Sequence, residues 1–377
     1  MESLRPCTPA QNGILAMFSN SNGDVYFNQM TLKAPTSLDK ALLKDAWTKV
    51  MRKHEMLRTG FVQLKNQECP FAMITYSEGV ASLPWDEVVD PTLSSVPSQT
   101  SKVLESLHQP PWFLAVESSD TTTTMQFSAL HAIYDAQSLH LIFADVAAAY
   151  RGEALGNAAS INSTLGPILT ETTSRSDESR EFWTNIGKEV QPVKFPDLHP
   201  FRVKEKELLT SCLSCSTPRQ NVEDGCQKLG MTLQAAGQAA WARLLSAYTG
   251  EPNVTFGVVL SGRNLSAAAQ EAAFPCLVTV PSPCRVGGTN REVLSSILKR
   301  NASLMKNQFT PLSKIQRWLK SDEGLFDTLF VYQKFASQKQ DAGEWDVVHE
   351  DARIDVRKCL FFKYPLSSVY STFGACF

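Results

Sequence analysis

Two hydrophobic periods meet within one short stretch of this sequence. From Met125 to His131 every second residue shares one face, which predicts a strand with one apolar side. From Leu139 to Tyr150 the apolar residues recur at helical spacing instead. His131 therefore lies where a strand ends and a turn begins, and Asp135 follows four residues later. A histidine at such a junction is free to project into a cleft.

His131 is a candidate catalytic residue on chemical grounds. A neutral imidazole, with an ordinary pKa of about 6.5, can accept a proton at neutral pH. A lone histidine on an apolar strand is nevertheless more often a structural residue. The strand and turn alone leave both interpretations open.

Composition limits the class of protein. The chain has 377 residues, 43% hydrophobic and 20% charged, which predicts a globular protein with a sizeable core in two lobes. Its formal net charge of −2 gives no reason to expect a nucleic acid or an anionic membrane as partner. No signal-peptide pattern is present, and no apolar run reaches the roughly 18 residues of a membrane span. We therefore expect a cytoplasmic protein.

The nine cysteines do not predict a disulfide framework or a metal site. Their number is odd, and the chain has no secretory signal. Cys212 and Cys215 form a CxxC pair, but no second pair lies at the spacing of a zinc site. No glycine-rich phosphate loop occurs either. We expect no metal and no bound nucleotide.

Further elements follow from the same periodicities. Ser37 is expected to cap a helix that buries Trp47, and Thr232–Tyr248 predicts a long amphipathic helix with Gly250 past its end. Gly, Ser, Thr and Asn are frequent between residues 152 and 176, which predicts a linker at 156–177 between lobes at 1–155 and 178–377. Strands are predicted at residues 25–33, 71–76, 112–117, 207–216 and 254–260.

Several motifs occur in a fixed order along the chain. They are TPAQNG at 8–13, RKHEMLRTGF at 52–61, HAIYD at 131–135, FGVVLSGRN at 256–264 and LFDTLFVYQ at 325–333. In this order, over residues 5–366, they resemble the condensation domains of nonribosomal peptide synthetases, the HHxxxDG family. The stretches YDAQS at 134–138 and PLSKIQRWL at 311–319 are most similar to the fungal, siderophore-synthetase type.

The resemblance implies an α/β fold of two chloramphenicol-acetyltransferase-like lobes, each an α/β sandwich, arranged in a V around a central tunnel. It implies that one carrier domain presents a thioester donor and another an amine acceptor, each on a phosphopantetheine arm. Carrier domains are thus the expected partners of a monomeric protein that binds no cofactor directly.

The resemblance also implies a role for individual residues. His131 is expected to be the catalytic residue, which accepts the proton of the amine or orients the amine. Asp135 is expected to pair with Arg263 and so tie its turn to the second lobe. Ser261 and Gly262 belong to the same motif as Arg263. Arg58 is expected to hold the first lobe together. His54 is not expected to take part in catalysis.

The chain departs from the family pattern at two positions of the central motif. Leu130 replaces the first histidine, and period 2 places it on the face opposite His131, where burial suits a leucine. Ala136 replaces the glycine, which would be unfavourable if the turn needs a positive φ. The final residues from Ser371 to Phe377 fit nothing in the pattern, so a truncated C-terminus is expected.

Three functions remain open from the sequence. The first is a condensation domain that forms peptide or ester bonds. The second is a carrier-docking module that has lost turnover, favoured by the two departures and the unusual C-terminus. The third is a stand-alone CoA-dependent acyltransferase, since that superfamily shares the HxxxD motif. Retention of His131 and Arg263 favours the first.

Overall fold

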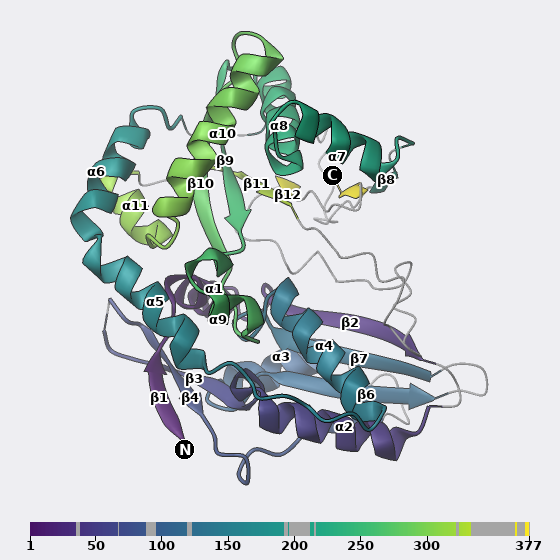
Figure 1. Ribbon diagram of the computed structural model, residues 1–377. Helices are drawn as coiled ribbons and strands as arrows, with labels where there is room; N and C mark the ends of the chain where they lie inside the picture. The colour runs from purple at the N-terminus through teal and green to yellow at the C-terminus, as the bar shows by residue number, and fades with distance from the viewer. Residues whose placement is uncertain are drawn as a thin grey trace, which may run out of the picture. The chain divides into compact units, whose positions relative to one another are not determined.

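The computed structural model describes residues 1–34, 38–66, 68–87, 96–118, 123–191, 195, 212–214, 216–321, 324–332, 366–367 and 374–376. Contacts divide the chain into two compact units, whose elements are labelled in Figure 1. Unit 1 contains Met1–Thr170 together with Arg263–Cys276. Unit 2 contains Glu171–Gly262 and the described residues from Leu277 onward. The described residues of unit 1 thus come from two separate stretches of sequence.

Unit 1 contains two sheets. The larger has the strand order β2-β7-β6-β5, and the smaller has the order β1-β4-β3. All neighbouring strands are antiparallel except β5 and β6, which are parallel. The strands are β1 (Ser3–Pro6), β2 (Phe27–Ala34), β3 (Thr59–Gln63), β4 (Phe71–Thr75), β5 (Trp85–Glu87), β6 (Trp112–Ser118) and β7 (Thr123–Leu130). The helices are α1 (Pro9–Asn20), α2 (Lys40–Lys53), the 3-10 turn η1 (Glu55–Arg58), α3 (Val96–Glu105), α4 (Ala136–Tyr150), the 3-10 turn η2 (Arg263–Leu265) and α9 (Ala267–Glu271).

The predicted strands of this unit are confirmed to within two residues, but two local predictions need correction. Asp39 is the N-cap of α2, because its Oδ1 accepts hydrogen bonds from the N–H groups of Ala41 and Leu42 at 2.8 and 3.0 Å. Ser37, the predicted cap, lies outside the described residues. The predicted linker at 156–177 contains the helix α5 (Ile161–Ser174), so its composition did not indicate its structure. The lobe limits at 155 and 178 remain predictions.

An aromatic cluster joins α2 and α4 to the larger sheet. The ring of Trp47 on α2 stacks on Phe127 of β7, with centroids 5.8 Å apart. Phe143 on α4 meets both rings edge-on, and Trp112 on β6 closes the group. Such aromatic pairs contribute about 0.5–1.5 kcal/mol each beyond the area they bury. The cluster fixes the end of β7 relative to the start of α4.

A charged contact also joins α2 and α4. Asp145 on α4 accepts from Lys53 at 2.9 Å through one oxygen and lies 2.6 Å from Nε2 of His54 through the other. Burial alone would raise the pKa of Asp145, but the hydrogen bonds from His54 and Lys53 outweigh it and lower that pKa. His54 thus has a structural contact between the two helices.

Unit 2 has a sheet with the order β10-β9-β11-β12, in which β9 is antiparallel to β10 and parallel to β11. A separate pair joins β8 and β13. The strands are β8 (Cys212–Ser214), β9 (Asn253–Leu260), β10 (Val278–Arg285), β11 (Thr328–Val331), β12 (Leu366–Ser367) and β13 (Gly374–Cys376). The helices are α6 (Ser176–Gly187), α7 (Arg219–Lys228), α8 (Leu233–Thr249), α10 (Asn290–Lys306) and α11 (Leu312–Trp318).

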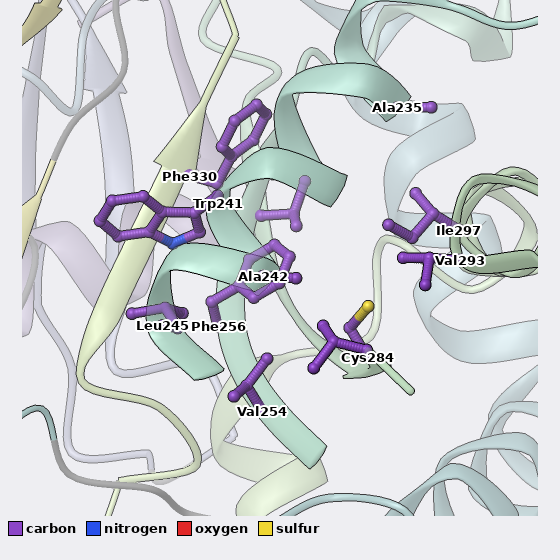
Figure 2. Close-up of a cluster of buried hydrophobic side chains, with 12 residues drawn as sticks. Ala235, Trp241, Ala242, Leu245, Val254, Phe256, Cys284, Val293, Ile297 and Phe330 are labelled. Atoms are coloured by element: carbon purple, nitrogen blue, oxygen red, sulfur yellow. The ribbon is translucent and has the colours of Figure 1, made fainter. Parts of the chain in front are cut away.

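Two apolar clusters contain alternating residues of this sheet. Phe256 and Phe330 belong to the cluster shown in Figure 2, with side chains of α8 and α10. Val280 and Leu329 belong to the other, with side chains of α6, α10 and α11. Because neighbouring residues of a strand point to opposite faces, helices pack on both faces of the sheet: α8 in one cluster, α6 and α11 in the other, and α10 in both. The unit is thus an α/β sandwich, as predicted.

Both ends of α8 match the sequence expectation. Thr232 accepts a hydrogen bond from the N–H of Ala235 as N-cap. Gly250 ends the helix at φ +75°, in the left-handed region that favours glycine. Of the other predicted strands in this unit, 254–260 is confirmed as β9, and the described part of 207–216 is the short β8.

Candidate active site

Residues 131–135 form the connection between β7 and α4, and their main chain is held from several sides. The N–H of His131 donates to the carbonyl of Tyr26 at 2.8 Å. Tyr26 itself has φ +70°, a conformation that is unfavourable for a bulky residue and that persists where the surroundings enforce it. Gln11 Nε2 donates to the carbonyl of Ala132 at 3.0 Å. The connection is therefore a fixed turn rather than a loose loop.

The ring of His131 has a defined tautomer. Its Nδ1 lies 2.9 Å from the main-chain oxygen of Tyr134. A carbonyl oxygen can only accept, so Nδ1 must carry the proton and the neutral ring must hold its lone pair on Nε2. The ring also stacks on the side chain of Tyr134, with centroids 4.7 Å apart and planes parallel.

The surroundings of His131 favour the neutral, basic form of its ring. Burial lowers its pKa, because the charged imidazolium loses water. The hydrogen bond to Tyr134 and the negative charge of Asp135 act in the opposite direction but do not cancel that effect. At neutral pH the ring is therefore unprotonated on Nε2 and able to accept a proton.

Asp135 ends the turn and starts α4. As N-cap it accepts from the N–H of Ser138 at 2.8 Å, while Ser138 Oγ accepts from the N–H of Asp135 at 2.6 Å. This reciprocal capping box satisfies two of the otherwise unpaired amides of the helix start. Asp135 thus fixes where the helix begins, four residues after His131.

The ion pair predicted between Asp135 and Arg263 is present. An Arg263 Nη lies 2.6 Å from Asp135 Oδ1, and the side chains are 4% and 7% exposed, respectively. The N–H of Cys276 donates to the second carboxylate oxygen at 2.9 Å. All three residues belong to unit 1, so the expectation that the pair ties the turn to the second lobe needs correction: Arg263 and Cys276 bound a segment that is itself part of unit 1.

Arg263 also organises its own segment. Its two terminal nitrogens donate to the carbonyls of Ala269, Ala272 and Phe274, at 2.5, 2.9 and 2.8 Å. Both terminal nitrogens of the guanidinium are therefore used in fixing 263–276 and holding Asp135.

The other residues of the family motifs, Ser261, Gly262 and Arg58, have structural contacts or conformations of their own. Gly262 is buried at φ +66°, which only glycine adopts readily, and the exposed Ser261 precedes it. Arg58 ends η1, where it donates to Glu2 at 2.7 Å and to the carbonyl of Tyr76. Arg58 thus joins the N-terminal residues to the end of β4, consistent with a structural role.

Neither departure from the motif disturbs the site. Leu130 is 0% exposed and part of the core of unit 1. Ala136 is the first residue of α4, and the described non-glycine residues with positive φ are Asn22, Tyr26 and Lys320. The expectation that a positive φ would penalise Ala136 is therefore wrong, because the position is helical.

Three residues of the site were not found from the sequence. Gln11 is the third helical residue of a capping box with Thr8, a signal that the TPAQ spacing contains. The hydrogen bond from Gln11 to Ala132 could not be predicted from any pattern in the sequence. Asn28 and Tyr134, joined at 2.6 Å between Nδ2 and the phenol oxygen, are equally without one.

The described residues give no indication of a metal or of a membrane span. No group of three or more His, Cys, Asp or Glu side chains among them is arranged to hold a metal ion. Cys276, although close to Asp135, has its pKa raised to about 12 by burial, so its thiol stays protonated. Within the same residues no helix is long and apolar enough to cross a membrane.

With this geometry established, comparison with known proteins defines the family. The chain belongs to the condensation-domain family, whose model matches residues 1–361. It is 46% identical over 361 residues to the nonribosomal peptide synthetase sidC of Arthroderma benhamiae, covering 94% of this chain and 7% of that protein. It is 28% identical over 347 residues to the hydroxamate-type ferrichrome siderophore peptide synthetase of Schizosaccharomyces pombe, covering 88% and 7%. The chain thus spans about 7% of the length of these relatives.

Solved structures share the fold. The condensation domain of the monacolin K polyketide synthase MokA matches with a TM-score of 0.72 and 14% identity, over 91% of this chain and 84% of that one. The first condensation domain of the CDA synthetase matches with a TM-score of 0.68 and 17% identity, over 91% and 85%. The predicted fold class, that of the two-lobed condensation domains, is therefore confirmed.

Proposed function

We propose that this chain joins an acyl or peptidyl thioester, held on one carrier domain, to an amine held on another. The observation that carries the proposal is the ring of His131, whose tautomer places a basic nitrogen at Nε2. Desolvation of the ring lowers the pKa of His131, so that nitrogen is unprotonated at neutral pH. Membership of the condensation-domain family supports the same reaction.

In the proposed reaction the amine nitrogen attacks the thioester carbonyl. A C–N bond forms, the C–S bond breaks, and the carrier thiolate leaves. The proton lost by the amine passes to Nε2 of His131, and from there to the departing sulfur. A well-placed general base contributes roughly 10²–10⁴ in rate, and holding two tethered substrates together supplies much of the rest.

Asp135 and Arg263 have positioning roles in this proposal. Asp135 fixes the start of α4, and Arg263 fixes Asp135 from a distant stretch of sequence. Ser261 and Gly262 lead into that stretch, with Gly262 providing the backbone conformation that the turn needs. Arg58 acts farther away, on the packing of the N-terminal residues.

The partners follow from the same proposal. Carrier domains of a nonribosomal peptide synthetase bring the substrates on phosphopantetheine, so the chain itself needs no cofactor. The relative from Schizosaccharomyces pombe, a hydroxamate-type ferrichrome siderophore peptide synthetase, supports a place in siderophore assembly. We propose that this takes place in the cytoplasm. The proposed protein acts as a monomer and binds neither nucleic acid nor membrane.

A condensation assay tests the proposal. One carrier loaded with an aminoacyl thioester is offered to a second carrier loaded with an amino acid, and the product is measured by intact-protein mass spectrometry. His131→Ala is compared with His140→Ala, which changes an exposed histidine on the same stretch of chain. Product that is lost in His131→Ala and kept in His140→Ala supports the proposal.

The assay also separates the alternatives. Carrier binding without product in the wild-type protein indicates a docking module that has lost turnover. Acyl transfer from free CoA to an amine, without any need for a carrier, indicates a stand-alone acyltransferase. Equal product from wild-type protein and His131→Ala refutes the assignment of His131 as the base.

A further inference from the structure

The side chain and main chain of Tyr134 both act on the ring of His131. The two rings are parallel with centroids 4.7 Å apart, which restricts the plane of the imidazole. The carbonyl of Tyr134 accepts from Nδ1, which restricts the tautomer. A shift of Tyr134 would therefore change both the direction of Nε2 and the nitrogen that carries the proton.

Tyr134 is in turn held by Asn28 on β2. The side chain of Tyr134 is 6% exposed, and its phenol oxygen lies 2.6 Å from Asn28 Nδ2. The ring of Phe127 meets it edge-on, with centroids 6.4 Å apart. Asn28 lies opposite Ala129 in the pairing of β2 with β7. The main chain of Asn28 is therefore fixed to β7, the strand that ends one residue before His131.

The amide of Asn28 is costly in this position. Asn28 is 2% exposed, and its Oδ1 is buried without a hydrogen-bond partner. A buried unsatisfied acceptor destabilises the folded state, so an apolar side chain of similar size would serve packing better. Stability of the fold therefore does not explain why an asparagine occupies this position. Its hydrogen bond to Tyr134 does, because that bond gives the amide a function in the site.

We propose that Asn28 and Tyr134 are positioning residues, which set the plane and tautomer of the His131 ring through the contact from amide to phenol to imidazole. The proposal rests on the proposed function, because it matters for turnover only if His131 is the base. It assigns no contact with substrate to either residue.

Two charged groups bear on any titration of this ring. Asp135 acts on it through its negative charge, and Arg263 neutralises part of that charge through the ion pair at 2.6 Å. Neither is altered by changes at Asn28 or Tyr134. A shift in the pKa of His131 in such variants therefore reports on the position of the ring and not on a lost charge.

The test compares Asn28→Val and Tyr134→Phe with a matched control. Both variants remove the polar contact and keep an apolar side chain in place. The control, Gln29→Val, changes the next residue of β2, whose amide contacts Gln126 and Ser128 instead. We expect kcat to fall about three- to tenfold in the two variants, with KM for either carrier within about twofold. We expect the double variant to lose no more than the worse single variant, because both remove one contact.

Two measurements separate positioning from a structural effect. Asn28→Val is expected to melt close to the wild-type temperature, since removal of the unsatisfied Oδ1 offsets the loss of the bond to the Tyr134 phenol, although its kcat falls. In ¹⁵N-labelled protein, the nitrogen resonances of His131 report the tautomer directly. In the two variants we expect partial population of the Nε2–H form and a pKa closer to the ordinary value of about 6.5.

The outcomes are distinct. Wild-type kcat and unchanged His131 resonances in both variants overturn the proposal, as does an equal loss of kcat in Gln29→Val. If the wild-type protein forms no product but the resonances shift as expected, the proposed function fails while the positioning of the ring by Asn28 and Tyr134 stands. If product forms and the resonances do not move, the proposed function stands and the positioning proposal fails.

Discussion

Replacement of Asp135 by alanine removes several interactions that meet at one carboxylate. The wild-type group accepts from Ser138, Arg263 and Cys276, at 2.8, 2.6 and 2.9 Å. Breaking a buried ion pair by removing one partner costs about 3–5 kcal/mol, because the other charge is left uncompensated. Loss of an N-cap costs about 1 kcal/mol, and these effects overlap. Since carbonyls still solvate the Arg263 guanidinium, we expect a total of about 3–4 kcal/mol.

The free energy of unfolding of unit 1 is the quantity to measure. Hydrogen exchange resolved by segment in a urea series reports it through β7, α4 and residues 263–276. Asp135→Asn keeps the cap acceptor and should cost less than Asp135→Ala. Asp45→Ala, which breaks an exposed pair with Lys49, should change stability by less than about 0.5 kcal/mol.

A double variant tests the reason for the loss. Asp135→Leu with Arg263→Met removes both charges, so it should be more stable than the sum of the single losses by at least about 1 kcal/mol. Additive losses, or an Asp135→Ala protein within about 1 kcal/mol of wild type, would refute the reasoning that an uncompensated buried charge is the dominant cost.

Three further predictions concern other positions. Gly60→Ala forces a Cβ against the carbonyl oxygen of His108, closer than real Cβ atoms approach, and should destabilise unit 1 by about 3 kcal/mol or more in urea unfolding. Gly13→Ala, with open space around it in α1, should be neutral or stabilising by up to about 1 kcal/mol. Ala136→Gly restores the glycine of the family motif. Because the position is helical, this change should not raise kcat and should lower the free energy of unfolding by up to about 1 kcal/mol. An increase in kcat would contradict the assignment of this residue to α4. Since desolvation lowers the pKa of His131, the base stays active below pH 6.5, and kcat should fall only as the pH drops through that lowered pKa. An acid limb above pH 6.5 would contradict the lowered pKa.

Local signals predicted the elements that carry the site. The change from period 2 to helical spacing placed β7 to within two residues and α4 to within three. The same kind of signal gave α8 with Thr232 and Gly250 at its ends. These features depend on residues close in sequence, so pattern and capping chemistry suffice to find them.

The contacts that complete the site could not be predicted in this way. The Asp135–Arg263 pair was expected through the family motifs, but the hydrogen bond from Cys276 was not. Asn28 and Tyr134 are 106 residues apart in sequence, and no spacing rule relates them. The small polar residues of 161–174 suggested a linker because composition alone does not show which neighbours stabilise a helix. Long-range packing decides such cases.

The two-part construction of unit 1 sets the order in which the site can be completed during synthesis. Asp135 and Arg263 are 128 residues apart in the chain. At roughly 5–20 residues per second, the ribosome needs roughly 6–26 s to make the intervening sequence. Throughout that time the nascent N-terminal part of the unit has the carboxylate of Asp135 without its cation. The turn that holds His131 can therefore form its ion pair with Arg263 only after the first stretch of unit 2, Glu171–Gly262, has been translated.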